Sequence, residues 1–276
     1  MFQMRSSNMI KIFTICHKQH NTVHNGGIYS IPIQAGHALS GIKMGIMTDD
    51  VGDNISYKNQ SYSELTAIYW VWKNVDNLDF VGFEHYRRHF DIKPSHIQKL
   101  KNNQILIIRP DHGNYRVVDR LIQLTSSEDV IIMINELLNL YPNWRKIIES
   151  YFWKSNEMTV GNMFIMSWDM FDNYAKFLFP FLEKLEPLIL NSPYKRQQRI
   201  FGYFSEVLLG LWLSANNIKY SIVPGLHNKY TTNLHYIFNR IRNTIAFHIS
   251  AQSRKMSFHK SMIEGLRLQG YNLNNF

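Results

Sequence analysis

Short β-branched runs alternate with amphipathic segments along most of this chain, and that alternation restricts the folds it can adopt. The run IKIFTIC at Ile10–Cys16 is apolar and rich in isoleucine, which predicts a buried strand. The segment LTAIYWVWKN at Leu65–Asn74 places apolar side chains three and four residues apart, which predicts a helix. Strands and helices that alternate in this way predict an α/β fold with a mostly parallel central sheet flanked by helices.

The same two periods recur further along the chain. Strands are predicted at residues 80–86, 104–108, 163–166 and 219–223. Helices are predicted at residues 129–140, 144–152, 168–185 and 199–215. Ser61 and Glu64 fit an S-x-x-E capping box ahead of the helix that begins near Leu65, and we therefore interpret this pair as structural.

Composition excludes several classes of protein. The single cysteine, Cys16, rules out an intramolecular disulfide and favours a reducing compartment. The apolar stretches fall far short of the about 20 residues that a membrane-spanning helix needs. The N-terminal segment lacks the apolar core and the small-residue cleavage site of a secretory signal. We therefore expect a cytoplasmic protein that is soluble or peripheral on the inner face of the cell membrane.

Positive charge is concentrated toward the C-terminal end. The formal net charge of the chain is +9, and residues 228–276 hold seven basic side chains against one acid, Glu264, which gives this tail +6. A basic end on a nearly balanced body predicts an anionic partner, for which lipid and nucleic acid both qualify by charge. We therefore divide the chain into one domain at 1–227 and a basic amphipathic helical appendage at 228–276.

The first candidate site is a loop with three carboxylates and an amide. Its residues are Asp49, Asp50, Asp53 and Asn54. Ligands of open α/β sheets bind beyond the carboxyl ends of the strands, so this loop is placed to hold ribose or sugar hydroxyls, or a divalent cation. The alternative is a solvated turn, because the same residues are common turn formers.

The second candidate is the segment EHYRRH at the end of the predicted strand 80–86. Arg87 and Arg88 each offer a planar fork of donors that matches phosphate oxygens, so they are suited to a diphosphate leaving group without a metal. His85 adds a donor or a proton-transfer group. The alternative is that the arginines are solvated at a strand end and that Glu84 pairs with one of them.

Other signals are weaker. Glu206 on a predicted helix suits deprotonation of an acceptor hydroxyl, although a surface or capping role explains a lone glutamate equally well. A zinc site is suggested by Cys16, His17, His20 and His24, but no second ligand pair with zinc spacing follows, so we expect no metal there. The chain contains no D-x-D triplet, no P-loop and no dinucleotide fingerprint.

Four segments together resemble a family of bacterial proteins from capsule, exopolysaccharide and lipopolysaccharide gene clusters. They are GDNISYKNQSYSELTAIYWVWKN at 52–74, VGFEHYRRHF at 81–90, GNMFIMSWDMFDNY at 161–174 and RIFGYFSEVLLGLWL at 199–213. The family was long catalogued as a domain of unknown function, and its members are regarded as glycosyltransferases. The resemblance implies a GT-A-like nucleotide-sugar-binding fold, a UDP-linked donor, and in some members galactofuranose transfer. Residues 120–130 depart from the family, so acceptor recognition is expected to differ.

The chemistry of the candidate residues and the resemblance lead to one hypothesis about their roles. We assign Arg87, Arg88 and His85 to the leaving diphosphate, and Glu206 or Glu84 to the base of an inverting displacement. The nucleotide or donor sugar is assigned to Asp49, Asp50, Asp53, Asn54 and Asn162. Manganese or magnesium remains an open possibility in the absence of a D-x-D triplet.

The expected partners follow from the resemblance to glycosyltransferases. The acceptor is a glycan or a glycan carried on a polyprenyl diphosphate at the inner leaflet. The tail interleaves basic residues with aromatic ones, which suits anionic lipid; these residues are Tyr236, Phe238, Arg240, Arg242, Phe247, Arg254, Lys255, Phe258 and Lys260. The alternatives are a helical face packed on the body, a basic nucleic-acid-binding module and a sugar hydrolase. No nucleic-acid motif is visible, so no nucleic-acid partner is expected.

Overall fold

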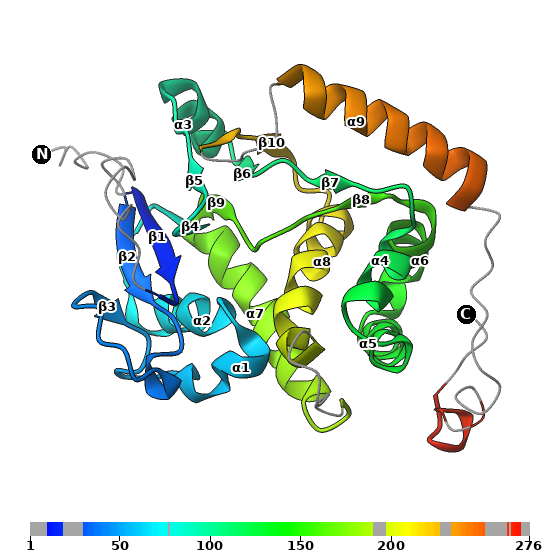
Figure 1. Ribbon diagram of the computed structural model, residues 1–276, viewed down its shortest axis with the longest axis horizontal. Helices are drawn as coiled ribbons and strands as arrows, with labels where there is room; N and C mark the ends of the chain where they lie inside the picture. The colour runs from blue at the N-terminus through cyan, green and yellow to red at the C-terminus, as the bar shows by residue number, and fades with distance from the viewer. Residues whose placement is uncertain are drawn as a thin grey trace, which may run out of the picture. The chain divides into compact units, whose positions relative to one another are not determined.

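The computed structural model describes residues 10–18, 30–76, 78–189, 197–226, 233–251, 264 and 266–271. They include a seven-stranded sheet with the order β10-β6-β9-β4-β1-β2-β3 (Figure 1). Its strands are β1 (Ile10–Cys16), β2 (Ser30–Gln34), β3 (Met47–Thr48), β4 (Phe80–His85), β6 (Ile105–Ile107), β9 (Phe164–Ser167) and β10 (Tyr220–Ile222). β9 runs antiparallel to β4 and β6, and the other neighbouring pairs are parallel. The predicted α/β fold with a mostly parallel sheet is confirmed.

Helices and short ladders connect these strands. The helices are α1 (Asn59–Tyr62), α2 (Leu65–Asn74), α3 (Pro94–Lys101), α4 (Val117–Leu124), α5 (Ser127–Leu140), α6 (Arg145–Lys154), α7 (Trp168–Leu185), α8 (Ile200–Ala215) and α9 (Asn233–Ala246). Two small antiparallel ladders join β5 (His89–Phe90) to β11 (Gly225–Leu226) and β7 (Asp111–His112) to β8 (Glu157–Met158). No helix in the described ranges is long and apolar enough to cross a membrane.

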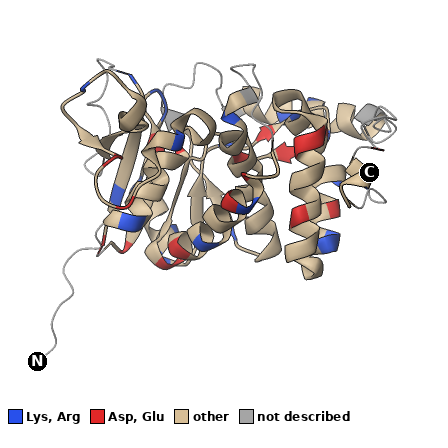
Figure 2. Ribbon diagram, turned by 90° about the horizontal axis from the view of Figure 1, so that it is seen from below, with Lys and Arg blue, Asp and Glu red and all other residues tan. Residues whose placement is uncertain are grey.

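The contacts divide the chain into two compact units. The first comprises residues 1–109, 160–179 and 218–229 and contains the whole seven-stranded sheet. The second comprises residues 110–159, 180–217 and 230–276 and contains α4, α5, α6, α8 and α9. Acidic and basic positions are interspersed along the ribbon (Figure 2). The division into 1–227 and 228–276 stays a prediction.

The start of α2 differs from the predicted capping box. Ser61 lies in the separate short helix α1, where its hydroxyl donates to the Lys58 carbonyl at 3.2 Å. The backbone then reverses at Ser63, whose φ is 51°. Glu64 precedes α2 but makes no side-chain cap, because its carboxylate accepts a hydrogen bond from Asn162 at 2.8 Å. The capping-box prediction was therefore wrong.

Gly82 lets β4 pass closely between its two neighbouring strands. A Cβ there would lie 2.6 Å from Ile165 Cγ1 and 3.2 Å from the Phe164 carbonyl oxygen. We expect Gly82→Ala to lower the free energy of unfolding by about 1–3 kcal/mol, because the added methyl overpacks the core. Urea unfolding measures this, with Gly41→Ala as control, since a Cβ at Gly41 meets nothing within 4 Å. Equal stability of the two variants would contradict the expectation.

Candidate functional site

Four parallel strands end at one edge of the sheet, and most of the predicted site residues follow them. β4, β1, β2 and β3 are parallel neighbours in that order, so the loop at 49–54 after β3 and the segment 85–88 after β4 share this edge. Three strand spacings separate the ends of β3 and β4, which is about 14 Å. The loop and the arginines therefore form two groups along the edge rather than one contact cluster.

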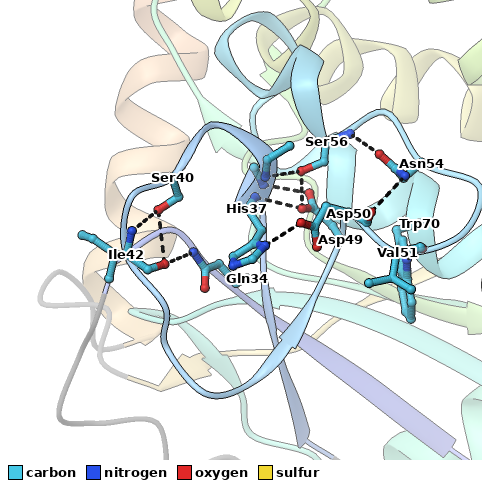
Figure 3. Close-up of polar contacts among 12 residues, drawn as sticks. Gln34, His37, Ser40, Ile42, Asp49, Asp50, Val51, Asn54, Ser56 and Trp70 are labelled. Carbon is cyan, nitrogen blue, oxygen red and sulfur yellow. Dashed lines mark hydrogen bonds and ion pairs between the residues drawn. The ribbon is translucent and has the colours of Figure 1, made fainter.

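Asp49 is used to hold its own loop together. It is 0% exposed. Its carboxylate accepts hydrogen bonds from the backbone N–H of Gly36 at 2.8 Å, the N–H of His37 at 3.0 Å and the Ser56 hydroxyl at 2.6 Å (Figure 3). A carboxylate that is fully buried and already accepts three hydrogen bonds from its own loop is out of reach of a sugar hydroxyl. We correct its assignment from ligand binding to structure.

Asn54 is likewise occupied by the turn. Its side-chain amide donates to the carbonyls of Asp50 at 3.2 Å and Gly52 at 2.8 Å, and its oxygen accepts from Ser56 N–H at 3.2 Å (Figure 3). These bonds to neighbouring backbone groups are the turn chemistry that was the sequence alternative. Asn54 therefore shapes the loop.

Asp50 and Asp53 are the reachable carboxylates of this loop. Asp50 is half-buried, and His37 Nδ1 lies 2.6 Å from its Oδ2; this hydrogen bond lowers the pKa of the Asp50 carboxyl. Asp53 is exposed and accepts from the Tyr69 hydroxyl at 3.1 Å. The Trp70 indole N–H donates to the carbonyl of Val51 and so holds the part of the loop that lies between Asp50 and Asp53.

Glu84 is enclosed by the framework of the sheet. It is 3% exposed. Its Oε1 lies within hydrogen-bond distance of Thr14 Oγ1 at 2.8 Å, Ser30 Oγ at 3.2 Å and His89 Nδ1 at 2.8 Å. Its Oε2 accepts from the Phe90 N–H at 3.0 Å.

These contacts decide between the roles that the sequence left open for Glu84. Its partner is His89, and the hydrogen bond between them raises the pKa of the imidazole. Burial, with a smaller contribution from Glu84, also raises the pKa of the Cys16 thiol to about 11. A carboxylate that four donors enclose is poorly placed to take a proton from an acceptor. We therefore correct its assignment from catalytic base to structural centre of β1, β2, β4 and β5.

A second group at the same edge joins three of the predicted residues. His85 Nε2 lies 2.5 Å from the Gly161 carbonyl oxygen, and the backbone N–H of Arg88 donates to the backbone carbonyl of His85 at 2.9 Å. A Cβ on Gly161 would lie 3.5 Å from His85 Nε2 and 3.8 Å from Arg88 Nη1, so all three are close together. Asn162 follows Gly161 and donates to Glu64 Oε1. We name His85, Arg88, Gly161, Asn162 and Glu64 the edge cluster; all lie in the first unit.

The edge cluster includes Glu64, which the sequence predicted to have a structural role. Glu64 and Asn162 are both buried, and their contact joins positions 98 residues apart. Asn162, with φ 47°, follows Gly161 with φ 76°, and Ser63, with φ 51°, precedes Glu64. Non-glycine residues in this backbone region cost free energy and often occur at functional sites. Neither the pairing nor the strain can be read from the sequence.

The guanidinium groups of Arg87 and Arg88 lie in different surroundings. Both are exposed. The Arg87 guanidinium lies over the Tyr86 ring at 4.9 Å from its centroid, whereas Arg88 Nη1 approaches Gly161. The hypothesis that both grip one diphosphate therefore rests more on Arg88 than on Arg87.

The remaining candidates lie elsewhere. Glu206 belongs to α8 in the second unit, where it is half-buried and its backbone carbonyl accepts from the Thr159 hydroxyl. His17 packs edge-on against Tyr86, while His20 and His24 lie outside the described residues. Within the described part of the chain, no group of three or more His, Cys, Asp or Glu side chains is arranged to hold a metal ion.

Known proteins are similar to this chain both in sequence and in fold. The model of a domain of unknown function, DUF4422, matches residues 11–217. The apo structure of the WbbM bifunctional glycosyltransferase is similar to this chain, with a TM-score of 0.72 and 28% sequence identity. The similarity covers 79% of this chain and 45% of that chain, so this chain spans less than half the length of WbbM. No curated protein matches. The resemblance to a family once catalogued as a domain of unknown function is confirmed, and the chain belongs to the DUF4422 family.

Proposed function

We propose that this protein is a glycosyltransferase that moves a sugar from a nucleotide-sugar donor to a glycan acceptor. The observation that carries the proposal is the similarity to a glycosyltransferase structure over 79% of the chain at 28% identity. The position of His85 and Arg88 at the carboxyl edge of a mostly parallel sheet supports it, because ligands of such sheets bind at that edge. Following the family resemblance, we extend the proposal to UDP-linked donors, galactofuranose first, and to capsule, exopolysaccharide or lipopolysaccharide acceptors.

The proposed reaction uses the edge cluster to stabilise the leaving group. The bond between the anomeric carbon and the diphosphate oxygen breaks, and negative charge develops on the diphosphate. The Arg88 guanidinium carries five N–H donors that can meet that charge, and its Nη1 and His85 Nε2 both lie close to Gly161. Donors fixed in place before the reaction act most strongly on such developing charge. Asn162 and Glu64 act as positioning residues, since they hold the turn that faces His85.

The remaining steps are assigned as follows. The acceptor oxygen attacks the anomeric carbon from the face opposite the diphosphate, and its proton passes to a carboxylate base. Of the two carboxylates assigned to this role, Glu84 is withdrawn, and Glu206 lies in the second unit, so no base is assigned within the edge cluster. Asp50 and Asp53 are the carboxylates proposed to bind hydroxyls of the donor.

A thermal-shift panel tests the proposal. Wild-type protein is heated with UDP-, GDP- and ADP-linked sugars and with the corresponding free diphosphates, each with manganese or with EDTA. A donor present at a hundred times its Kd is expected to raise Tm by roughly 5–10 °C, because it binds the folded state alone. The chelator arm reports whether donor binding needs a metal.

The outcomes separate the proposal from its rivals. A response to one class of nucleotide sugar, followed by transfer to a glycan acceptor, supports the proposal. Release of free sugar without transfer to an acceptor would favour a hydrolase. Tight, salt-sensitive nucleic-acid binding with no response to any nucleotide sugar would favour a basic binding module and overturn the proposal.

A further inference from the structure

Helix α9 has one face packed on the second unit. The Tyr236 ring packs edge-on against His112 with centroids 6.0 Å apart, and Asn243 Nδ2 donates to the His112 carbonyl at 2.6 Å. Phe247, in the turn that continues α9, is 2% exposed. Positions 236, 243 and 247 are seven and four residues apart, so they form one stripe of the helix. This inner face fixes α9 (orange in Figure 1) beside β7.

The opposite face of α9 is apolar and exposed. It carries Leu234, Ile237, Phe238, Ile241 and Ile245, continued by Ile249. The exposed fractions of these side chains run from 49% to 79%. Their spacing of three and four residues places them on one stripe, away from the residues that pack on β7. Large apolar side chains that gather on one exposed face mark a site of interaction.

The Arg, Lys, Asp and Glu side chains of α9 itself are of one sign. No acidic residue occurs between Glu206 and Glu264 in the sequence, whereas Arg240 and Arg242 lie on α9 itself and are exposed. An exposed apolar stripe on a helix without acids, with arginines beside it, is the pattern of helices that lie in the interface of an anionic bilayer. A second copy of the chain on this face would bring two helices together that both carry arginines and no acid, which like-charge repulsion disfavours.

We propose that α9 docks this protein on an anionic membrane surface through the outer face formed by Leu234, Ile237, Phe238, Ile241 and Ile245. The lipid-binding surface proposed here is smaller than the one predicted from the sequence, which took in basic and aromatic residues of the whole tail. Tyr236 and Phe247 belong to the inner face and are removed from it, while Arg254, Lys255, Phe258 and Lys260 lie outside the described residues. The proposal is independent of the reaction that the edge cluster performs.

Vesicle flotation tests the proposal on the full chain. Vesicles of phosphatidylcholine alone are compared with vesicles of phosphatidylcholine and phosphatidylglycerol, at low and at high salt. Wild-type protein is expected to float with the anionic vesicles, to stay in solution with the neutral ones, and to bind more weakly at high salt because salt screens the attraction.

Two matched pairs of variants locate the contact. Phe238→Asp is expected to weaken partitioning about thirtyfold or more, while Leu39→Asp, at a side chain of similar exposure in the first unit, leaves it unchanged. The double change Arg240→Gln with Arg242→Gln is expected to weaken it about thirtyfold, at about fivefold per charge. The control for this double change is Lys101→Gln with Lys154→Gln, which removes the same net charge from exposed positions outside α9 and should leave partitioning unchanged. Circular dichroism confirms that each variant is folded.

Specific results would overturn the proposal. Flotation that is equal with neutral and anionic vesicles, or absent with both, removes the anionic membrane as the occupant. Wild-type binding by Phe238→Asp removes the outer face of α9 as the contact. A chain that ignores vesicles, elutes as a dimer and becomes monomeric on Phe238→Asp assigns the face to a second copy.

Discussion

Replacing Arg88 with alanine is expected to lower kcat for sugar transfer about 100- to 1000-fold. Arg88 Nη1 and His85 Nε2 both lie close to Gly161 at the carboxyl edge of β4, where we propose that the guanidinium meets the charge that develops on the leaving diphosphate. Loss of one such fixed donor costs this much in other enzymes that stabilise a developing oxyanion. Because the side chain is exposed, the free energy of unfolding should change by no more than about 0.5 kcal/mol. Initial rates and urea unfolding of the same preparation measure both quantities.

Arg87→Ala is the matched control for this experiment. It removes the same side chain one residue earlier, where the guanidinium lies over the Tyr86 ring. We expect a loss of kcat smaller than about tenfold, in line with a lost cation–π contact rather than a lost oxyanion donor. Equal large losses in both variants would restore the hypothesis that the two arginines act together. Normal turnover of Arg88→Ala would remove Arg88 from the reaction.

Arg88→Lys separates the shape of the guanidinium from its charge. Lysine keeps the positive charge but lacks the planar fork that binds two phosphate oxygens at once. Activity between that of wild type and that of the alanine variant would indicate bidentate binding. Full activity would indicate that a point charge at this position is sufficient.

The sequence predicted the elements that have strong periodicity. β1 and α7 have the predicted bounds, because a β-branched run and a long amphipathic stretch each fit one structure only. β2 was not predicted, since SIPIQ contains a proline that usually argues against a strand. The structure tolerates Pro32 because β3 pairs only with Ile33 and Gln34, which leaves Pro32 at a free edge on that side.

The candidate site was predicted in part. Chemistry-bearing residues after parallel strands were expected at one edge of the sheet, and His85 and Arg88 are there together with Asp50 and Asp53. Sequence alone could not distinguish a carboxylate that faces outward from one that its own loop encloses, as Asp49 is. That distinction depends on backbone N–H groups of the turn at Gly36 and His37, which residue types do not reveal.

Glu64 shows a second limit of prediction from sequence, in which a local motif hides a long-range contact. Glu64 lies three residues after Ser61, which is the spacing of a capping box, so the motif accounted for both residues without any tertiary contact. Its actual partner, Asn162, lies on the turn before β9, and only the antiparallel pairing of β9 with β4 brings that turn to the edge. A local motif therefore predicted the wrong contact because a long-range one replaced it.

Glu84→Gln is expected to lower the free energy of unfolding by about 3–5 kcal/mol. The change removes the charge from a buried site and turns an acceptor into a donor that faces hydroxyl and N–H groups of Thr14 and Phe90. It also leaves the His89 imidazole without its carboxylate. Urea unfolding measures the loss, and Glu183→Gln, at an exposed position of α7, should stay within about 0.5 kcal/mol of wild type.

The pH dependence of stability identifies the cause of that loss. The hydrogen bond to Glu84 raises the pKa of His89 in the folded state above its ordinary value. The contribution of the pair is therefore fully present below the ordinary histidine pKa and is lost as pH rises through the raised pKa of the folded protein. Wild type should lose stability over this interval, and Glu84→Gln should not. A Glu84→Gln protein of normal stability that no longer transfers sugar would instead return Glu84 to the reaction, because a framework carboxylate cannot be removed without unfolding cost.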